Sequence, residues 1–146
     1  MLETLKLQDS KQLRALSIDD YTSPTPVTIN ENETLAGAFS MFEKEKIRHL
    51  PVVDNQGHLK GILTERNLHA LQDFSSLKNP QVKDCMEKDV ICVQEGANLM
   101  ETAFALSDKK IGSVLVKDHS GKLSGIFTTT DALNALIEVI RGEIEL

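Results

Sequence analysis

The chain contains 146 residues, a length that suits one domain or two small, closely packed units and excludes a large multidomain enzyme. Hydrophobic residues make up 40% of the chain and charged residues 26%, which is typical of a folded globular protein and not of a disordered or fibrous one. The 16 Lys and Arg residues against 22 Asp and Glu residues give a net charge of −6, which argues against nucleic-acid binding because that binding depends on attraction to phosphate.

The sequence has no pattern that indicates a membrane span or a metal site. No apolar run reaches the roughly 20 residues that a spanning helix needs. Cys85 and Cys92 lack the spacing of a zinc ligand pair, and the four histidines are scattered. We therefore expect a cytoplasmic protein with no metal, no membrane partner and no nucleic-acid partner, in which both cysteines act as small apolar residues.

Residues 1–16 form an N-terminal extension. Leu13 and Leu16 lie three positions apart, as on one face of a helix. We expect an extra helix here that either caps the rest of the molecule or reaches toward a partner chain.

An internal repeat organises the remainder of the chain. The segment Gly61-Ile62-Leu63-Thr64 returns as Gly125-Ile126-Phe127-Thr128, a shift of 64 residues (125 − 61), and the same shift aligns many other positions without a gap. We divide the chain into copy one (residues 17–72), a polar linker (residues 73–80) and copy two (residues 81–146).

Both copies show the same order of periodicities. In copy one we expect a strand at 27–29, a helix, a strand at 50–53, a turn at 54–57, a strand at 59–63 and a second helix. In copy two the strands fall at 90–93, 113–116 and 123–127, with a turn at 118–121. The expected buried faces of the helices are Leu35, Ala38, Phe39 and Phe42 in copy one, and Leu99, Ala103 and Leu106, then Leu133, Leu136, Ile137 and Ile140, in copy two.

Each copy is thus a β-α-β-β-α unit that is too small to bury its own sheet and helices well. We expect an α/β (α+β) fold in which the two tandem units pack around a pseudo-two-fold axis, with clefts between them. The apolar positions of the last helix exceed what one small sheet can cover, which predicts a homodimer through the helix faces.

The order of elements, the run from Lys46 to Asp54 and the doubled Gly-Ile-x-Thr-x-x-Asn/Asp signature resemble a tandem pair of CBS domains over about residues 17–140. The resemblance implies a regulatory module that binds adenine nucleotides in the clefts between its two copies and often dimerises. Composition and spacing alone do not indicate adenosine.

Thr128 and Asp131 stand where the last strand of copy two becomes a helix. The N-terminus of a helix suits a phosphate, and a carboxylate can accept hydrogen bonds from the paired hydroxyls of a ribose, the role that the resemblance implies for Asp131. Thr-x-x-Asp is also the pattern of a capping box, which needs no ligand. The residues leave both interpretations open, and the resemblance favours the ligand.

Copy one carries Thr64 and Asn67 at the matching places, and Asn67 has one acceptor oxygen where Asp131 has two. In the family, residues at the positions of Arg48 and His49 contact the phosphates of a nucleotide whose ribose is held by the other copy. Copy two has Gly112 and Ser113 at these places. We therefore expect one strong site per chain, in which Arg48 and His49 both supply positive charge.

The resemblance implies two sets of binding residues. The favoured cleft is expected to use Thr25, Pro26, Val27, Ile47, Arg48, His49, Ile126, Thr128, Thr130 and Asp131. The weaker cleft is expected to use Ile62, Thr64, Asn67, Val90, Ile91, Ile111, Gly112 and Ser113.

No catalytic motif, phosphate-binding loop or dinucleotide fingerprint is present in the sequence. We expect a stand-alone, non-enzymatic sensor with no cofactor that binds AMP, ADP or ATP and signals to an effector protein or to its own dimer interface. S-adenosylmethionine, a nicotinamide dinucleotide or a cyclic dinucleotide fits the same residues. The alternative is a ligand-free dimerisation or scaffold module that docks on an enzyme or transporter.

Overall fold

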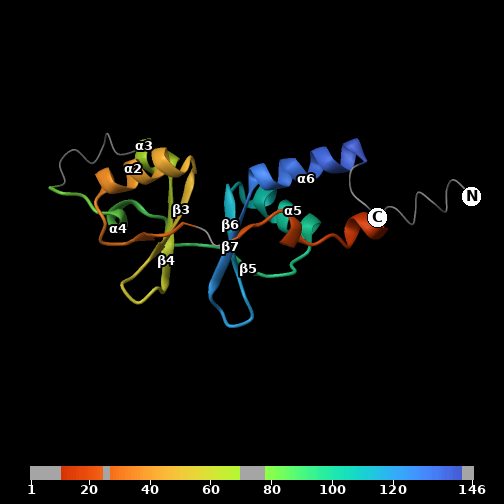
Figure 1. The fold of residues 1–146 in the computed structure, drawn as a ribbon, viewed down its shortest axis with the longest axis horizontal. Helices are drawn as coiled ribbons and strands as arrows, with labels where there is room; N and C mark the ends of the chain where they lie inside the picture. The colour runs from red at the N-terminus through yellow and green to blue at the C-terminus, as the bar shows by residue number, and fades with distance from the viewer. Residues whose placement is uncertain (1–10, 25–26, 70–77, 143–146) are drawn as a thin grey trace, which may run out of the picture. The chain divides into compact units, whose positions relative to one another are not determined.

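The computed structural model describes residues 11–24, 27–69 and 78–142 (Figure 1). These residues form two compact units. The central unit comprises the described residues of Pro26–Val90. The split unit is built from two stretches of the chain, Met1–Thr25 and Ile91–Leu146.

The central unit contains a three-stranded sheet and short helices. Strand β2 (Ile29–Asn30) runs parallel to β3 (His49–Val53), and β3 is antiparallel to β4 (Leu59–Thr64). The helices are α2 (Leu35–Glu45), α3 (Glu65–His69) and α4 (Val82–Cys85).

The split unit repeats this plan with one additional strand. Its sheet has the order β1-β7-β6-β5, formed by β1 (Ser23–Pro24), β7 (Leu123–Thr128), β6 (Ser113–Lys117) and β5 (Cys92–Gln94). The remaining elements are the 3-10 turn η1 (Ile18–Asp20) and the helices α5 (Leu99–Lys109) and α6 (Thr129–Arg141). Residues 11–14 are helical, as expected for the extension, and residues 1–10 lie outside the described residues.

Equivalent helices begin and end in the same way in both units. Thr34 caps α2 by accepting a hydrogen bond from the backbone N–H of the third helical residue, and Asn98 caps α5 in the same manner. Lys46 and Lys110 end these helices with a left-handed φ of 53° at each. The repeat is therefore conserved within the chain down to single backbone angles, and the β-α-β-β-α plan is confirmed.

Each unit has its own hydrophobic core, and the helix stripes contribute to it largely as expected. Phe39 is the exception in copy one, because its side chain is 44% exposed. The central core contains Ile29, Leu35, Ala38, Phe42, Leu50, Val52, Leu63, Leu68 and Val82. The core of the split unit contains Ile18, Leu99, Leu106, Val114, Val116, Phe127 and Ala135.

The compact units do not follow the boundaries of the repeats, because the two copies exchange their leading segments. Ile18, in copy one by sequence, is fully buried in the core of the split unit, and its N–H donates to the Ala97 carbonyl at 2.9 Å. Val82, the equivalent residue of copy two, is buried in the central core, and its N–H donates to Glu33 at the same distance. A sequence repeat shows that two segments are equivalent but not which sheet each one joins.

The apolar stripe on α6 differs from its prediction. Leu133, Leu136, Ile137 and Ile140 are exposed, Ile140 at 75%, and Ala135 is the buried residue of the helix. The small side chain of Ala135 permits close approach to the core, whereas the pattern of large apolar residues marks an amphipathic helix without showing what covers it. The expected burial of these four residues is therefore wrong within the described part of the chain.

The strands that open each repeat begin later than expected. Val27 and Thr28 precede β2, and Val90 and Ile91 precede β5. The Ile91 carbonyl accepts a hydrogen bond from the Leu115 N–H at 3.0 Å, but Ile91 is not part of the strand.

Most of the expected linker falls outside the described residues. No helix in the described ranges is long and apolar enough to cross a membrane.

Candidate ligand-binding sites

Strand β7 ends at Thr128, which is also the N-cap residue of helix α6. The Asp131 Oδ2 atom accepts hydrogen bonds from the Thr128 N–H at 2.8 Å and the Thr128 hydroxyl at 3.0 Å, and the Asp131 N–H donates to Thr128 Oγ1 at 3.3 Å. The first N–H of the helix, that of Thr129, donates to the Gly112 carbonyl at 3.1 Å. The capping box that the sequence left open is therefore formed in this structure.

The cap uses only one of the two oxygen atoms of the Asp131 carboxylate. Both side-chain hydrogen bonds end on Oδ2, and Oδ1 accepts none from the residues that the structure describes. The side chain is half-buried, and Thr130 beside it is exposed. Capping and binding of a ligand hydroxyl are thus compatible roles for one aspartate.

The equivalent turn of the central unit has the same capping geometry, but it leaves different hydrogen-bonding atoms available. Asn67 Oδ1 accepts from the Thr64 N–H at 2.8 Å and from the Thr64 hydroxyl at 2.7 Å. The Asn67 amide donates to Glu87 Oε1 at 3.2 Å. The one acceptor oxygen of Asn67 is therefore already used twice, and its amide is directed to a neighbouring acid.

His49 begins β3 and pairs with Thr64 across the sheet, while the Glu65 N–H donates to the Arg48 carbonyl at 2.9 Å. Burial lowers the pKa of His49 below its ordinary value of 6.5, the positive charge of Arg48 lowers it further, and Glu87 opposes both. His49 is therefore mostly neutral at pH 7. The expectation that both residues supply positive charge needs correction, because the exposed Arg48 alone is a cation at this pH.

Within each unit the structure brings together residues that the sequence analysis assigned to different clefts. Ser113 pairs directly with Thr128 in the split unit, as His49 pairs with Thr64 in the central unit. The expected cooperation of Arg48 with Asp131 joins residues of different units, and it stays a prediction.

The apolar candidates occupy ordinary packing positions. Ile62 and Ile126 are buried at 6% and 8% exposure, whereas Val27 is 36% exposed. Thr25 and Pro26 lie outside the described residues. The remaining candidates are half-buried, namely Ile47, Val90, Ile91, Ile111 and Gly112.

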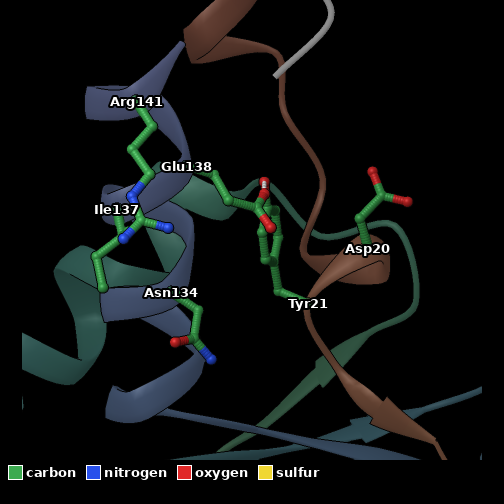
Figure 2. Close-up of a pocket in the computed structure, with 6 residues that line it drawn as sticks. All are labelled: Asp20, Tyr21, Asn134, Ile137, Glu138 and Arg141. Carbon is green, nitrogen blue, oxygen red and sulfur yellow. Dashed lines mark hydrogen bonds between the residues drawn. The ribbon is translucent and has the colours of Figure 1, made fainter. Parts of the chain in front are cut away.

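Sequence reasoning missed a polar pocket on the split unit, with a volume of about 440 Å³ (Figure 2). The Tyr21 hydroxyl donates to Glu138 Oε2 at 2.7 Å inside it. Burial, followed by the hydrogen bond to Glu138, raises the pKa of Tyr21 to about 12. The stripe of polar residues along α6 could have indicated this pocket. Its lining residues are Asp20, Tyr21, Asn134, Ile137, Glu138 and Arg141.

Comparison with known proteins agrees with this architecture. The CBS domain family model matches the chain twice, at residues 18–71 and 82–138. A CBS domain-containing protein of Dictyostelium discoideum is 32% identical over 84% of this chain and 92% of its own length. The chain also matches inosine-5′-monophosphate dehydrogenase of Methanocaldococcus jannaschii at 32% identity over 79% of its length, but it spans only 22% of that relative.

Two solved structures share the fold. The structure of CBSX2 in complex with AMP has a TM-score of 0.75 at 25% identity, covering 86% of this chain and 98% of that one. The CBS domain pair of protein MJ0100, in complex with 5′-methylthioadenosine and S-adenosyl-L-methionine, has a TM-score of 0.74 at 27% identity, covering 83% and 99%. With two family matches over most of its length and a full-length relative, the chain belongs to the CBS domain family.

Proposed function

We propose that this chain is a non-enzymatic sensor that binds an adenosine-containing ligand, with AMP, ADP or ATP as the first candidates. Asp131 accepts hydrogen bonds from the ribose hydroxyls, and Arg48 contacts phosphate. Occupancy of the site is signalled to a partner protein or to the dimer interface of the chain.

The observation that carries this proposal is the Oδ1 atom of Asp131. It stands at the first turn of a 13-residue helix, where the helix dipole favours an anionic ligand, and it accepts no hydrogen bond from the described residues. A hydrogen bond from a ribose hydroxyl to a charged acceptor contributes about 1.5–3 kcal/mol. The cap holds this carboxylate in place before the ligand arrives, which reduces the entropy lost on binding.

The ligands of the two similar structures support adenosine as the shared part. CBSX2 was solved with AMP, and the MJ0100 pair with 5′-methylthioadenosine and S-adenosyl-L-methionine. These molecules have an adenosine moiety in common and differ in their phosphate or sulfur substituents. We therefore infer that the ribose acceptor determines the ligand class, and that other residues choose within it.

Calorimetric titration of the full chain tests the proposal. The ligands are adenosine, AMP, ADP, ATP and S-adenosylmethionine, with GMP as the control for the base. We expect one tight site per chain for at least one adenosine ligand. No heat and no thermal stabilisation with any of them would refute the sensor function, and two equivalent tight sites would refute the asymmetry between the copies.

We further propose that the chain forms a homodimer through the exposed apolar face of α6, whose residues are Leu133, Leu136, Ile137 and Ile140. Ile140→Glu places a charge in this face and is expected to give a monomer in light scattering. Ser107→Glu, at an exposed position of α5, is the matched control and should leave the mass unchanged. A wild-type monomer at micromolar concentration, with and without nucleotide, would contradict the dimer.

The same apolar face favours the second candidate function, a ligand-free scaffold that docks on an enzyme or transporter. The capping box at Thr128 agrees with it, because capping a helix is a structural role that needs no ligand. A dimer that binds none of the adenosine ligands would favour this alternative over the sensor.

A further inference from the structure

The polar pocket of the split unit lies away from the Thr128 turn and is made from two segments of the chain. Asp20 and Tyr21 form one wall at the end of η1 (Figure 2). The other wall is a stripe on α6, at positions 134, 137, 138 and 141, which repeat at the spacing of one helix face. Its volume of about 440 Å³ falls within the range of small-molecule sites.

The groups that line the pocket have opposite charges. Asp20 and Glu138 are acids, and the Tyr21 hydroxyl occupies only the Oε2 atom of Glu138. The guanidinium of Arg141 has five N–H donors, so it can hold a ligand carboxylate together with a protein partner. Figure 2 shows Glu138 turned from α6 toward the Tyr21 ring, and Asp20 on the other side of that ring with its carboxylate directed away from it.

The repeated architecture does not require this set of residues. The positions that match the α6 stripe by the shift of 64 carry Ala70, at the end of copy one, and Asp73, Phe74 and Leu77, in the linker. The position of copy two that matches Tyr21 carries Cys85. Because the phenol, the acid and the guanidinium occur in only one copy, the β-α-β-β-α plan by itself does not account for them.

We propose that this pocket binds a small zwitterion of the amino-acid class. The ammonium group of the ligand meets the carboxylate of Glu138, and its carboxylate meets the donors of Arg141 and Asn134. The Tyr21 ring supplies an apolar surface for the body of the ligand. This site uses none of the residues assigned to the proposed adenosine site.

The first test is a titration of the full ¹⁵N-labelled chain with each standard L-amino acid. Binding is monitored by the changes in amide chemical shifts. At least one is expected to move the resonances of residues 20–21 and 134–141 at concentrations up to about 10 mM, the range of weak polar sites. If none does so, the proposal is overturned. The result is separable from the adenosine titration, because neither measurement requires the other ligand.

The second test compares three matched ligands that differ by one charged group. If L-leucine is the amino acid that binds most tightly, the two matched ligands are L-leucinamide, which lacks the carboxylate, and 4-methylpentanoate, which lacks the ammonium group. We expect each of these two to bind at least several-fold more weakly than L-leucine. Equal binding of all three would show adsorption on the apolar surface and would overturn the zwitterion site.

Two variants test which residue contacts each charged group of the ligand. Glu138→Gln should remove the preference for L-leucine over 4-methylpentanoate, and Arg141→Gln should remove the preference over L-leucinamide. Glu101→Gln, on an exposed position of α5, is the control that should change neither preference. Unchanged preferences in folded Glu138→Gln and Arg141→Gln would overturn the assignment, and Tyr21→Phe provides a further variant if either of them fails to fold.

Discussion

The two strand-to-helix turns of this molecule have nearly identical capping geometry but differ in the side chain that completes the cap. Asp131 caps α6 through Thr128 as Asn67 caps α3 through Thr64, and the hydrogen bond to the threonine N–H measures 2.8 Å in both. The carboxylate keeps an oxygen available among the described residues, whereas the amide has its oxygen and its nitrogen engaged. The repeat therefore sets the cap, and the capping side chain decides which of its polar atoms the cap leaves available.

A second comparison concerns the glycines that open the repeated signature. A Cβ atom on Gly61 would overlap the Glu87 carbonyl oxygen, which belongs to backbone. On Gly125 it would overlap the Thr22 methyl group and lie 2.9 Å from the Ser23 carbonyl oxygen. Both glycines admit the exchanged segment of the other copy, but the obstacle at Gly61 is the more rigid one.

The largest expected effect is on stability, from Gly61→Ala. Overpacking against a backbone oxygen is expected to lower the free energy of unfolding by about 1–3 kcal/mol. Gly125→Ala is the matched variant and should cost less, because the threonine side chain that it meets first can turn away. Urea denaturation of both variants measures the difference, and a larger loss for Gly125→Ala would contradict the ranking.

Asp131→Asn converts the cap of copy two into that of copy one. Because Asn67 shows that an amide caps this turn, we expect little change in melting temperature. Binding of every adenosine ligand should weaken by about 1–2 kcal/mol, since a charge-assisted hydrogen bond becomes a neutral one. Calorimetry and thermal melts on the same samples provide the two readouts.

Asp131→Ala is the variant to compare with Asp131→Asn. It should weaken ligand binding and also lower the melting temperature, because loss of a cap typically costs about 0.5–2 kcal/mol. If Asp131→Ala destabilises the free protein but binds nucleotide normally, Asp131 is a capping residue only. The ribose assignment would then be wrong.

Arg48→Ala tests the phosphate contact that the family resemblance implies. We expect a loss of about 1 kcal/mol for AMP, ADP or ATP, a smaller loss for adenosine, and a weaker dependence of nucleotide binding on salt concentration. Arg66→Ala, on an exposed position of the neighbouring helix α3, is the control. Equal losses for adenosine and AMP would show that Arg48 does not meet phosphate.

The smallest expected effect is the pH dependence from His49, whose counterpart in copy two, Ser113, does not titrate in this range. The pKa of His49 is lowered in the folded state, so the unfolded chain binds more protons as the pH falls through 6.5. This histidine therefore contributes stability above that pH and loses it below. His49→Gln should flatten the stability profile between about pH 5 and 7, and an unchanged profile would count against the burial of the ring as the cause.

The candidate site was only partly predictable. The Thr-x-x-Asp pattern identified both of its possible roles, because a cap depends on local spacing. The lowered pKa of His49 was not predictable, since its main cause is burial of the ring, which depends on tertiary packing, and since Glu87, which opposes it, is distant in sequence. The pocket around Tyr21 was missed for the same reason, because Tyr21 and Glu138 are separated by 117 residues.

The sequence by itself determined the repeat, the order of elements in each copy, the turns and the helix caps, because all of these depend on residues that are close along the chain. Tertiary structure decided that Ile18 and Val82 exchange places between the copies and that the large apolar residues of α6 remain exposed. Periodicity shows that a helix has an apolar face, but only packing shows whether Ala135 or Ile140 turns toward the core. Which sheet a short segment joins depends on contacts between distant residues, and these contacts leave no local pattern in the sequence.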